Sequence, residues 1–158
     1  MNSKWKTGKK EYIDLNSIFE VLATVVKSKD HKIIIGTDSV KLGYNFIFTS
    51  AICVLNKEFY DRRYFYTREK IKDDSYLDLP KRLLKETEDS IKLAIDIQEK
   101  LCDANIEIHA DVNTNSLHMS SRYKNMITGY ITGCGFKVKT KPQSFVASSI
   151  ADLHTRKS

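Results

Sequence analysis

Apolar residues in the first part of the chain recur with a helical period and then with the pattern of strands. Within residues 14–30 they return about every 3.6 positions, which predicts an amphipathic helix capped by Asp14 or Asn16. Residues 33–39 are apolar and β-branched without alternation, as in a strand buried on both faces. Two further strands are predicted, at 44–55 and 59–67, with a turn at Asn56 and Lys57 between them. Three sequential antiparallel strands are the simplest interpretation.

The second part of the chain alternates between helices and strands. Polar residues 68–78 predict a loop before this alternation begins. The predicted elements are a helix at 79–103, a strand at 106–112, a helix capped within 113–115, a strand from Phe136 to Lys141 stopped by Pro142, and a last helix capped by Ser144. We therefore expect an α/β fold with a mixed five-stranded sheet, three antiparallel strands followed by two parallel ones, and helices on both faces.

Length and composition limit the alternatives. A chain of 158 residues with 41% hydrophobic content predicts one domain over 1–158, made of a basic N-terminal segment and extra helix (1–31) and a core (32–157). No apolar run has the length of a signal peptide or a membrane span. This predicts no membrane partner, and three cysteines without a CxxC pair favour reduced thiols and so predict a cytoplasmic location. The net charge of +6 suits a polyanionic partner such as nucleic acid.

One acid of the long helix differs from its neighbours. At 100° per residue, Glu86 falls inside the apolar arc of the helix, whereas Glu88 projects to the opposite face and Asp89 lies on the border. An acid on a helix usually belongs to a solvated face, and this is how we interpret Glu88. A buried carboxylate is costly unless a cation or a hydrogen-bond donor meets it. Glu86 is therefore a candidate functional residue.

Three further acids lie at the ends of predicted elements. Asp38 ends the first core strand, Asp111 ends the fourth strand, and Asp152 lies in the last helix. Each has a structural alternative: Asp38 in a turn, Asp111 as a helix cap, and Asp152 as an ordinary surface acid. His109 precedes Asp111 by two residues on the same strand, where it could either orient a ligand or pack as a buried strand histidine.

Several local strings resemble one family as a set. They are IIIGTDS at 33–39, Arg82 with Glu86 and Thr87, HADVN at 109–113, and KPQSFVASSIAD at 141–152. The chain resembles the ribonuclease H-like superfamily, and within it the YkuK-type family, over roughly residues 32–157. The resemblance implies a ribonuclease H-like fold more strongly than it implies an activity.

The resemblance also implies a site. In that superfamily, acids at these places hold two divalent cations, which makes Asp38, Glu86, Asp111 and Asp152 the expected catalytic metal ligands. Mg²⁺ or Mn²⁺ would be the cofactor, because hard oxygen donors suit these ions and a metal pair can activate water for phosphodiester hydrolysis. Ser39, His109 and Asn113 are expected beside the ligands. Basic residues expected to contact the phosphate backbone are Lys139, Lys141 and Arg156.

Three functions remain open at this stage. The leading hypothesis is a metal-dependent nuclease acting on RNA, DNA or a hybrid. The first alternative is a catalytically silent ribonuclease H-like module that binds nucleic acid or a protein partner. A second alternative comes from the actin-like phosphotransferases, which also carry an Asp near Gly and Thr, as at Gly36 to Asp38; those proteins need two such halves and glycine-rich phosphate turns, and this chain has six glycines and one half. The oligomeric state is left open.

Overall fold

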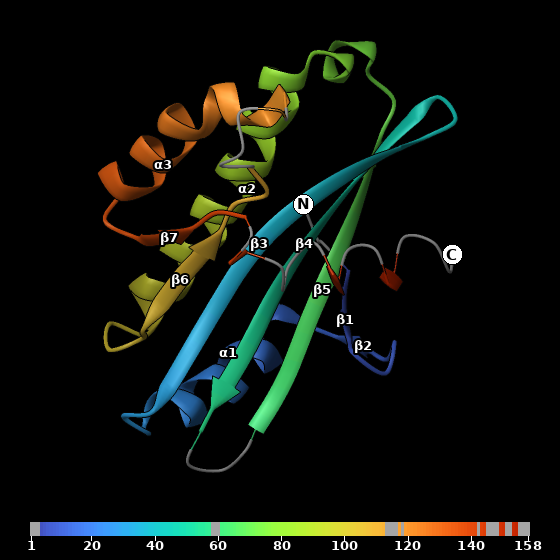
Figure 1. The fold of residues 1–158 in the computed structure, drawn as a ribbon. Helices are drawn as coiled ribbons and strands as arrows, with labels where there is room; N and C mark the ends of the chain where they lie inside the picture. The colour runs from blue at the N-terminus through green and yellow to red at the C-terminus, as the bar shows by residue number, and fades with distance from the viewer. Residues whose placement is uncertain are drawn as a thin grey trace.

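The described residues form one mixed seven-stranded sheet with the strand order β2-β1-β5-β4-β3-β6-β7 (Figure 1). This computed structural model describes residues 4–57, 61–112, 117, 119–141, 143–144, 149–150 and 153–154, without the side chains of Asp61 and Arg62. The strands are β1 (Trp5–Thr7), β2 (Tyr12–Ile13), β3 (His31–Leu42), β4 (Asn45–Asn56), β5 (Asp61–Ile71), β6 (Ile106–His109) and β7 (Lys137–Lys139). The helices are α1 (Leu15–Val26), α2 (Leu79–Lys100) and α3 (Lys124–Gly133), with 3-10 turns η1 (Asp74–Leu77) and η2 (Met119–Tyr123).

The central strands form the predicted antiparallel meander. β3 pairs with β4 along its whole length, and Gly43 closes the hairpin with φ +62°, a conformation that glycine adopts without strain. The predicted two-residue turn at Asn56 and Lys57 is wrong, because Asn56 still pairs with Asp61. The predicted loop at 68–78 is also partly wrong, since β5 continues to Ile71. Cross-strand pairing with β4 keeps these charged residues extended despite their low strand propensity.

Two parallel strands complete the predicted part of the sheet. β6 pairs in parallel with β3, and β7 pairs in parallel with β6, which confirms the expected order of three antiparallel and two parallel strands. The expected number of five strands is too low, because β1 and β2 extend the sheet beside β5. Trp5 of β1 is only 4% exposed and belongs to the main core. The basic N-terminal segment is thus part of the sheet.

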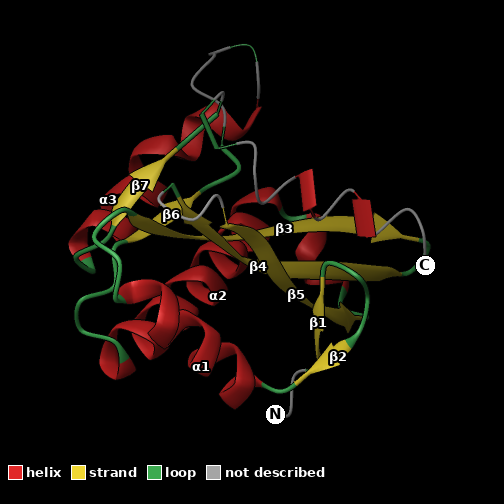
Figure 2. Ribbon diagram, turned by 90° about the horizontal axis from the view of Figure 1, so that it is seen from below, coloured by secondary structure: helices red, strands yellow, loops and turns green. Residues whose placement is uncertain are grey.

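Helices α1, α2 and α3 share one face of the sheet. Figure 2 shows α1 and α2 on one side of the central strands and the short described pieces at 149–150 and 153–154 on the other. Side chains of α1, α2 and α3 join Ile33 and Ile35 of β3 in the main core, while Ile34 belongs to a smaller cluster with Ile150 on the opposite face. Most of the predicted last helix lies outside the described residues. Within the described part of the chain, no helix is both long enough and apolar enough to cross a membrane.

Candidate functional site

The parallel pairing of β3 with β6 ends just before Asp38. The last parallel pair between these strands is Gly36 with His109, while β3 continues to Leu42. Asp38 lies two residues beyond that pair, is partly buried, and accepts a hydrogen bond of 2.9 Å from the backbone N–H of Ser39. Ligand sites in α/β proteins commonly form in crevices at the carboxyl ends of parallel strands. Asp38 lies at such a position.

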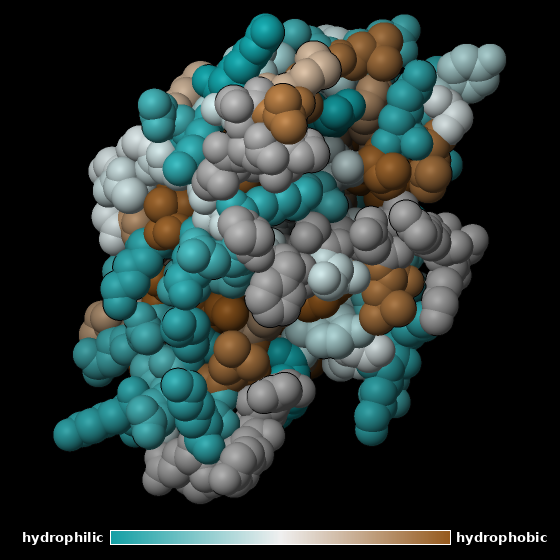
Figure 3. All heavy atoms as spheres, viewed as in Figure 1, coloured by the Kyte–Doolittle hydropathy of each residue, from teal (hydrophilic) through white to brown (hydrophobic). Residues whose placement is uncertain are grey.

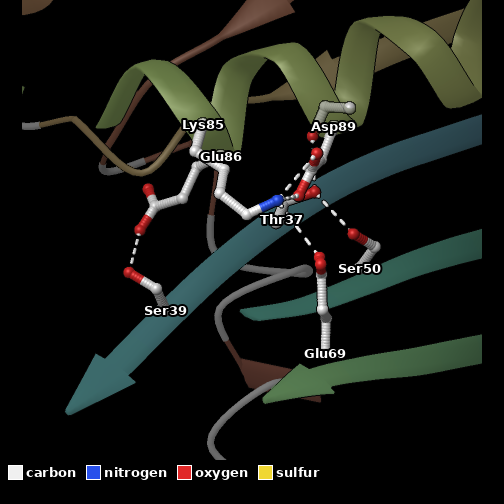
Figure 4. Close-up of polar contacts among 8 residues, drawn as sticks. Thr37, Ser39, Ser50, Glu69, Lys85, Glu86 and Asp89 are labelled. Atoms are coloured by element: carbon white, nitrogen blue, oxygen red, sulfur yellow. Dashed lines mark hydrogen bonds and ion pairs between the residues drawn. The ribbon is translucent and has the colours of Figure 1, made fainter. Parts of the chain in front are cut away.

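Glu86 reaches this place from α2, on the helical side of the sheet. As predicted from its position in the apolar arc, Glu86 is buried, with 7% of its surface exposed, whereas Glu88 is exposed and Asp89 is intermediate. The hydroxyl group of Ser39 donates a hydrogen bond to Oε1 of Glu86 (Figure 4). The buried carboxylate thus has the hydrogen-bond donor that we expected, and this donor is Ser39, the residue next to Asp38.

Asp111 follows the end of β6 and is held beside β7. Backbone hydrogen bonds from Ala110 to Lys139 (2.9 Å) and from Lys141 to Val112 (3.0 Å) prolong the pairing on both sides of Asp111. This brings Lys141 Nζ to 2.5 Å from Asp111 Oδ1. The sequence predicts that Lys141 contacts the phosphate backbone of a ligand. Its contact with a predicted metal ligand leaves no signal in the sequence, because it depends on the pairing that continues beyond β7.

Burial and neighbouring acids raise the pKa of both Asp38 and Glu86. Burial raises the pKa of Asp38 to about 7, and the neighbouring Asp111 contributes through repulsion and a hydrogen bond between the two carboxyl groups. Burial also raises the pKa of Glu86 well above its usual value, with repulsion from Asp38 and Asp111 adding to this effect. Asp38, Glu86 and Asp111 thus form a mutually repelling set, which we call the carboxylate cluster.

Hydroxyl groups and a second charged set occupy the space between α2 and the sheet. Thr37 Oγ1 lies 2.9 Å from Ser50 Oγ (Figure 4). It lies at the same distance from Ser90 Oγ, and these three hydroxyl groups link two strands to the helix. One turn away, Lys85 Nζ pairs with Glu69 at 3.1 Å and Asp89 at 3.0 Å. These contacts fix α2 over β3 and β4, and therefore fix the position of Glu86.

A small cavity separates the helix from the end of β6. Its volume is about 10 Å³, and both Glu86 and Asp111 line it, together with Thr37 and Ser90. A space of this size holds about one water molecule when polar groups surround it. Apolar side chains, among them Leu83, Ile108 and Ile127, form the other part of its lining, so the two acids border one small cavity of mixed character.

The other predicted site residues have different surroundings. His109 is buried, and its Nε2 lies 2.8 Å from Glu107 Oε1; burial lowers the pKa of His109 despite that contact. Lys139 Nζ lies 3.8 Å from the same Glu107 oxygen and its side chain is 44% exposed. Glu107 was missed in the sequence because it appears as an ordinary strand acid. Asn113, Asp152 and Arg156 lie outside the described residues.

The oxygen donors of the carboxylate cluster suit a divalent cation, but the present arrangement of the side chains does not form a metal site. Oxygen donors that repel one another are relieved by a bound cation, and Mg²⁺ or Mn²⁺ prefers such donors. Among the residues that the structure describes, however, no three His, Cys, Asp or Glu side chains are grouped so that they could hold a metal ion. Glu86 is turned toward Ser39, and Asp111 toward Lys141.

The comparisons with known proteins give one match. Residues 16–156 match the family model described as Ribonuclease H-like. No curated protein and no solved structure matches the chain. The matched range contains all three members of the carboxylate cluster.

Proposed function

The chain belongs to the ribonuclease H-like family, and from this premise we propose that it is a divalent-metal-dependent nuclease. The observation that carries the proposal is the carboxylate cluster: Asp38, Glu86 and Asp111 come from three separate elements to one strand end, where burial and repulsion raise the pKa of Asp38 to about 7. Such a cluster costs stability in the absence of a ligand. Strongly perturbed carboxyl groups are typical of functional sites.

In this proposal Asp38, Glu86 and Asp111 hold the metal, with Asp152 as the fourth expected ligand. When bound, Mg²⁺ or Mn²⁺ supplies activation of a water molecule and stabilisation of the leaving oxygen in phosphodiester hydrolysis. Ser39 orients the Glu86 carboxylate through its hydrogen bond. The Lys141 ammonium now balances the charge of Asp111, and binding of a cation would release it toward the phosphate of a nucleic acid.

A catalytically silent module that binds nucleic acid is the second candidate. It is favoured by the contact between Asp111 and Lys141, since an ammonium that balances a predicted metal ligand can stand in place of the metal. Both candidates use the net charge of +6 to bind a polyanion. They differ in one respect: only the nuclease should cleave nucleic acid when a divalent cation is present.

The deciding experiment is cleavage of labelled single-stranded, duplex, hybrid and junction oligonucleotides, as RNA and as DNA, with Mg²⁺, Mn²⁺ or EDTA. The nuclease hypothesis predicts metal-dependent cleavage. Asp38→Asn should abolish this cleavage, and Glu88→Gln should leave it intact. Glu88 is a suitable control because it is an exposed acid on the same helix as Glu86. Binding without cleavage by folded wild-type protein would favour the silent module.

A further inference from the structure

A second site lies on the sheet, at the edge formed by β1, β2 and β5. It is a pocket of about 220 Å³ lined by Lys4, Lys6, Tyr12, Tyr66, Thr67 and Arg68. Three of these six residues are cationic and two are aromatic. We propose that this pocket, hereafter the basic pocket, binds a backbone phosphate of a single-stranded nucleic-acid segment that leads away from the carboxylate cluster. The direction of the strand, away from the carboxylate cluster, rests on the proposed nuclease function.

The basic pocket and Asp38 share one face of the sheet. Trp5 packs into the core on the helical side, so alternation along β1 directs Lys4 and Lys6 to the opposite face. Tyr66 of β5 lies on that face as well, in the same cluster as Ile34. Alternation along β3 and β5 then directs Asp38 and Arg68 to this face too.

Register places the pocket at a defined distance from the cluster. Thr49 of β4 pairs with Asp38 on one side and with Arg68 on the other, so the three residues form one row across the sheet. Neighbouring strands lie about 4.8 Å apart, which puts the backbones of Asp38 and Arg68 roughly 10 Å apart. At a rise of about 3.4 Å per nucleotide, roughly three nucleotides of a stacked strand span this distance.

Arg68 lines the pocket and has a buried donor that the described residues do not use. Its Nε atom is buried and has no hydrogen-bond partner within the described structure. A buried polar atom without a partner costs free energy, and a ligand with acceptor oxygens removes that cost. A phosphate is such a ligand, and a guanidinium group recognises it through paired N–H donors. Lys4 and Lys6 supply two further positive charges at the same pocket.

Tyr12 gives the pocket a surface for a base. Its side chain is 71% exposed, and Lys6 Nζ lies 5.0 Å from the centre of its ring. Tyr66, in contrast, is 4% exposed and its ring is stacked on His154 at 3.9 Å, so it forms a wall of the pocket. Exposed aromatic rings beside cations are the usual means of binding single strands, whose bases are free to stack. The pocket therefore favours single-stranded over duplex nucleic acid.

The inference can be tested by fluorescence anisotropy with fluorescein-labelled oligonucleotides of about 16 nucleotides, both single-stranded and duplex. Binding is measured in EDTA over a range of salt concentrations. The test variant is Lys4→Gln/Lys6→Gln. Its control is Lys27→Gln/Lys29→Gln, which removes the same charge from two exposed lysines at the end of α1. We expect the test variant to bind single strands about ten-fold more weakly than the control at moderate salt, and to reduce the slope of log K against log salt by about 1.4.

Tyr12→Ala is expected to weaken binding of single strands at least about five-fold, with little effect on duplex. Equal binding by the two double variants would overturn the proposal, as would tighter binding of duplex than of single strands, or no binding by the wild type. Because EDTA removes divalent cations, the result does not depend on catalysis. If the test variant binds more weakly but the wild type cleaves no substrate, the nuclease proposal is refuted and the basic pocket stands. If the wild type cleaves but both double variants bind equally, the basic pocket is refuted and the nuclease proposal stands.

Discussion

The Ser39 hydroxyl donates a hydrogen bond to the buried carboxylate of Glu86, and thereby joins the central strand β3 to helix α2 beside Asp38. A buried carboxylate needs such a donor, because desolvation otherwise penalises its charged form. The bond lowers the pKa of Glu86, in opposition to the larger effect of burial. Ser39 therefore has a positioning role at the carboxylate cluster.

Replacing Ser39 by alanine should destabilise the protein by about 1 to 3 kcal/mol, because it leaves a buried acceptor without its donor. Urea denaturation at pH 7.5 measures the loss of free energy of unfolding. Ser39→Thr keeps the hydroxyl group and should cost less. Equal losses in the two variants would show that the hydrogen bond is not the cause.

The free energy of unfolding should contain a contribution from Asp38 that falls as the pH rises from about 4 to about 7. The folded-state pKa of Asp38 is raised to about 7 from 3.8, so the folded protein binds more protons than the unfolded chain within this window. Glu86 acts in the same direction above pH 4.5, whereas His109, whose pKa is lowered, acts in the opposite direction below pH 6.5. Urea midpoints measured in EDTA across this range give the total dependence.

Comparison with Asp38→Asn isolates the contribution of Asp38. This variant should be less stable than or similar to the wild type at pH 4, and more stable at pH 8 by about 1 to 3 kcal/mol. Glu88→Gln, on the exposed face of the same helix, should keep the wild-type dependence. Parallel curves for the wild type and Asp38→Asn would contradict the raised pKa.

Divalent cations should raise the melting temperature at pH 8, since they bind the folded carboxylate cluster and relieve its repulsion. At 100 times the dissociation constant, a bound ion stabilises by about 2.7 kcal/mol. Scanning calorimetry with Mg²⁺, Mn²⁺ and EDTA should show this shift in the wild type and in Glu88→Gln. The shift should be lost in Asp38→Asn and in Asp111→Asn; a shift that survives in both would place the cation elsewhere.

Replacing Lys141 by glutamine should strengthen the binding of divalent cations several-fold, because the Lys141 ammonium competes with the cation for Asp111. Isothermal titration of the metal-free protein measures the change. The matched control is Lys139→Gln, which removes the same charge two residues away, near Glu107 instead of Asp111. Weaker binding in Lys141→Gln than in the control would assign Lys141 a supporting role at the metal.

The sequence was informative where burial follows from periodicity. The 3.6-residue arc of α2 predicted that Glu86 is buried and Glu88 exposed. Of the two caps predicted for α1, Asp14 and Asn16, the structure uses Asp14. The unbroken apolar run before Asp38 predicted a central strand, and β3 has neighbours on both sides. These features are local, so a short window of sequence contains them.

Features that depend on partners distant in the sequence were missed. β1 and β2 have three and two residues, too few for a period to emerge, and they become strands because β1 pairs with β5 and β2 pairs with β1. The single signal was Trp5 between two lysines, an apolar residue with polar neighbours on both sides. The contact between Lys141 and Asp111 likewise arises from register across β6 and β7 and leaves no mark in either segment.

The parallel pairing of β3 with β6 also bears on the order of folding. Ile33 pairs with Ile106, so this contact closes a loop that contains β4, β5 and α2, and long loops close late because of their entropy. The meander can form early from neighbouring strands, but Asp111 reaches Asp38 only once β6 has joined the sheet. A ligand that requires the whole carboxylate cluster would therefore have no binding site on a partly folded chain. Such a ligand should slow unfolding while leaving the rate of folding nearly unchanged.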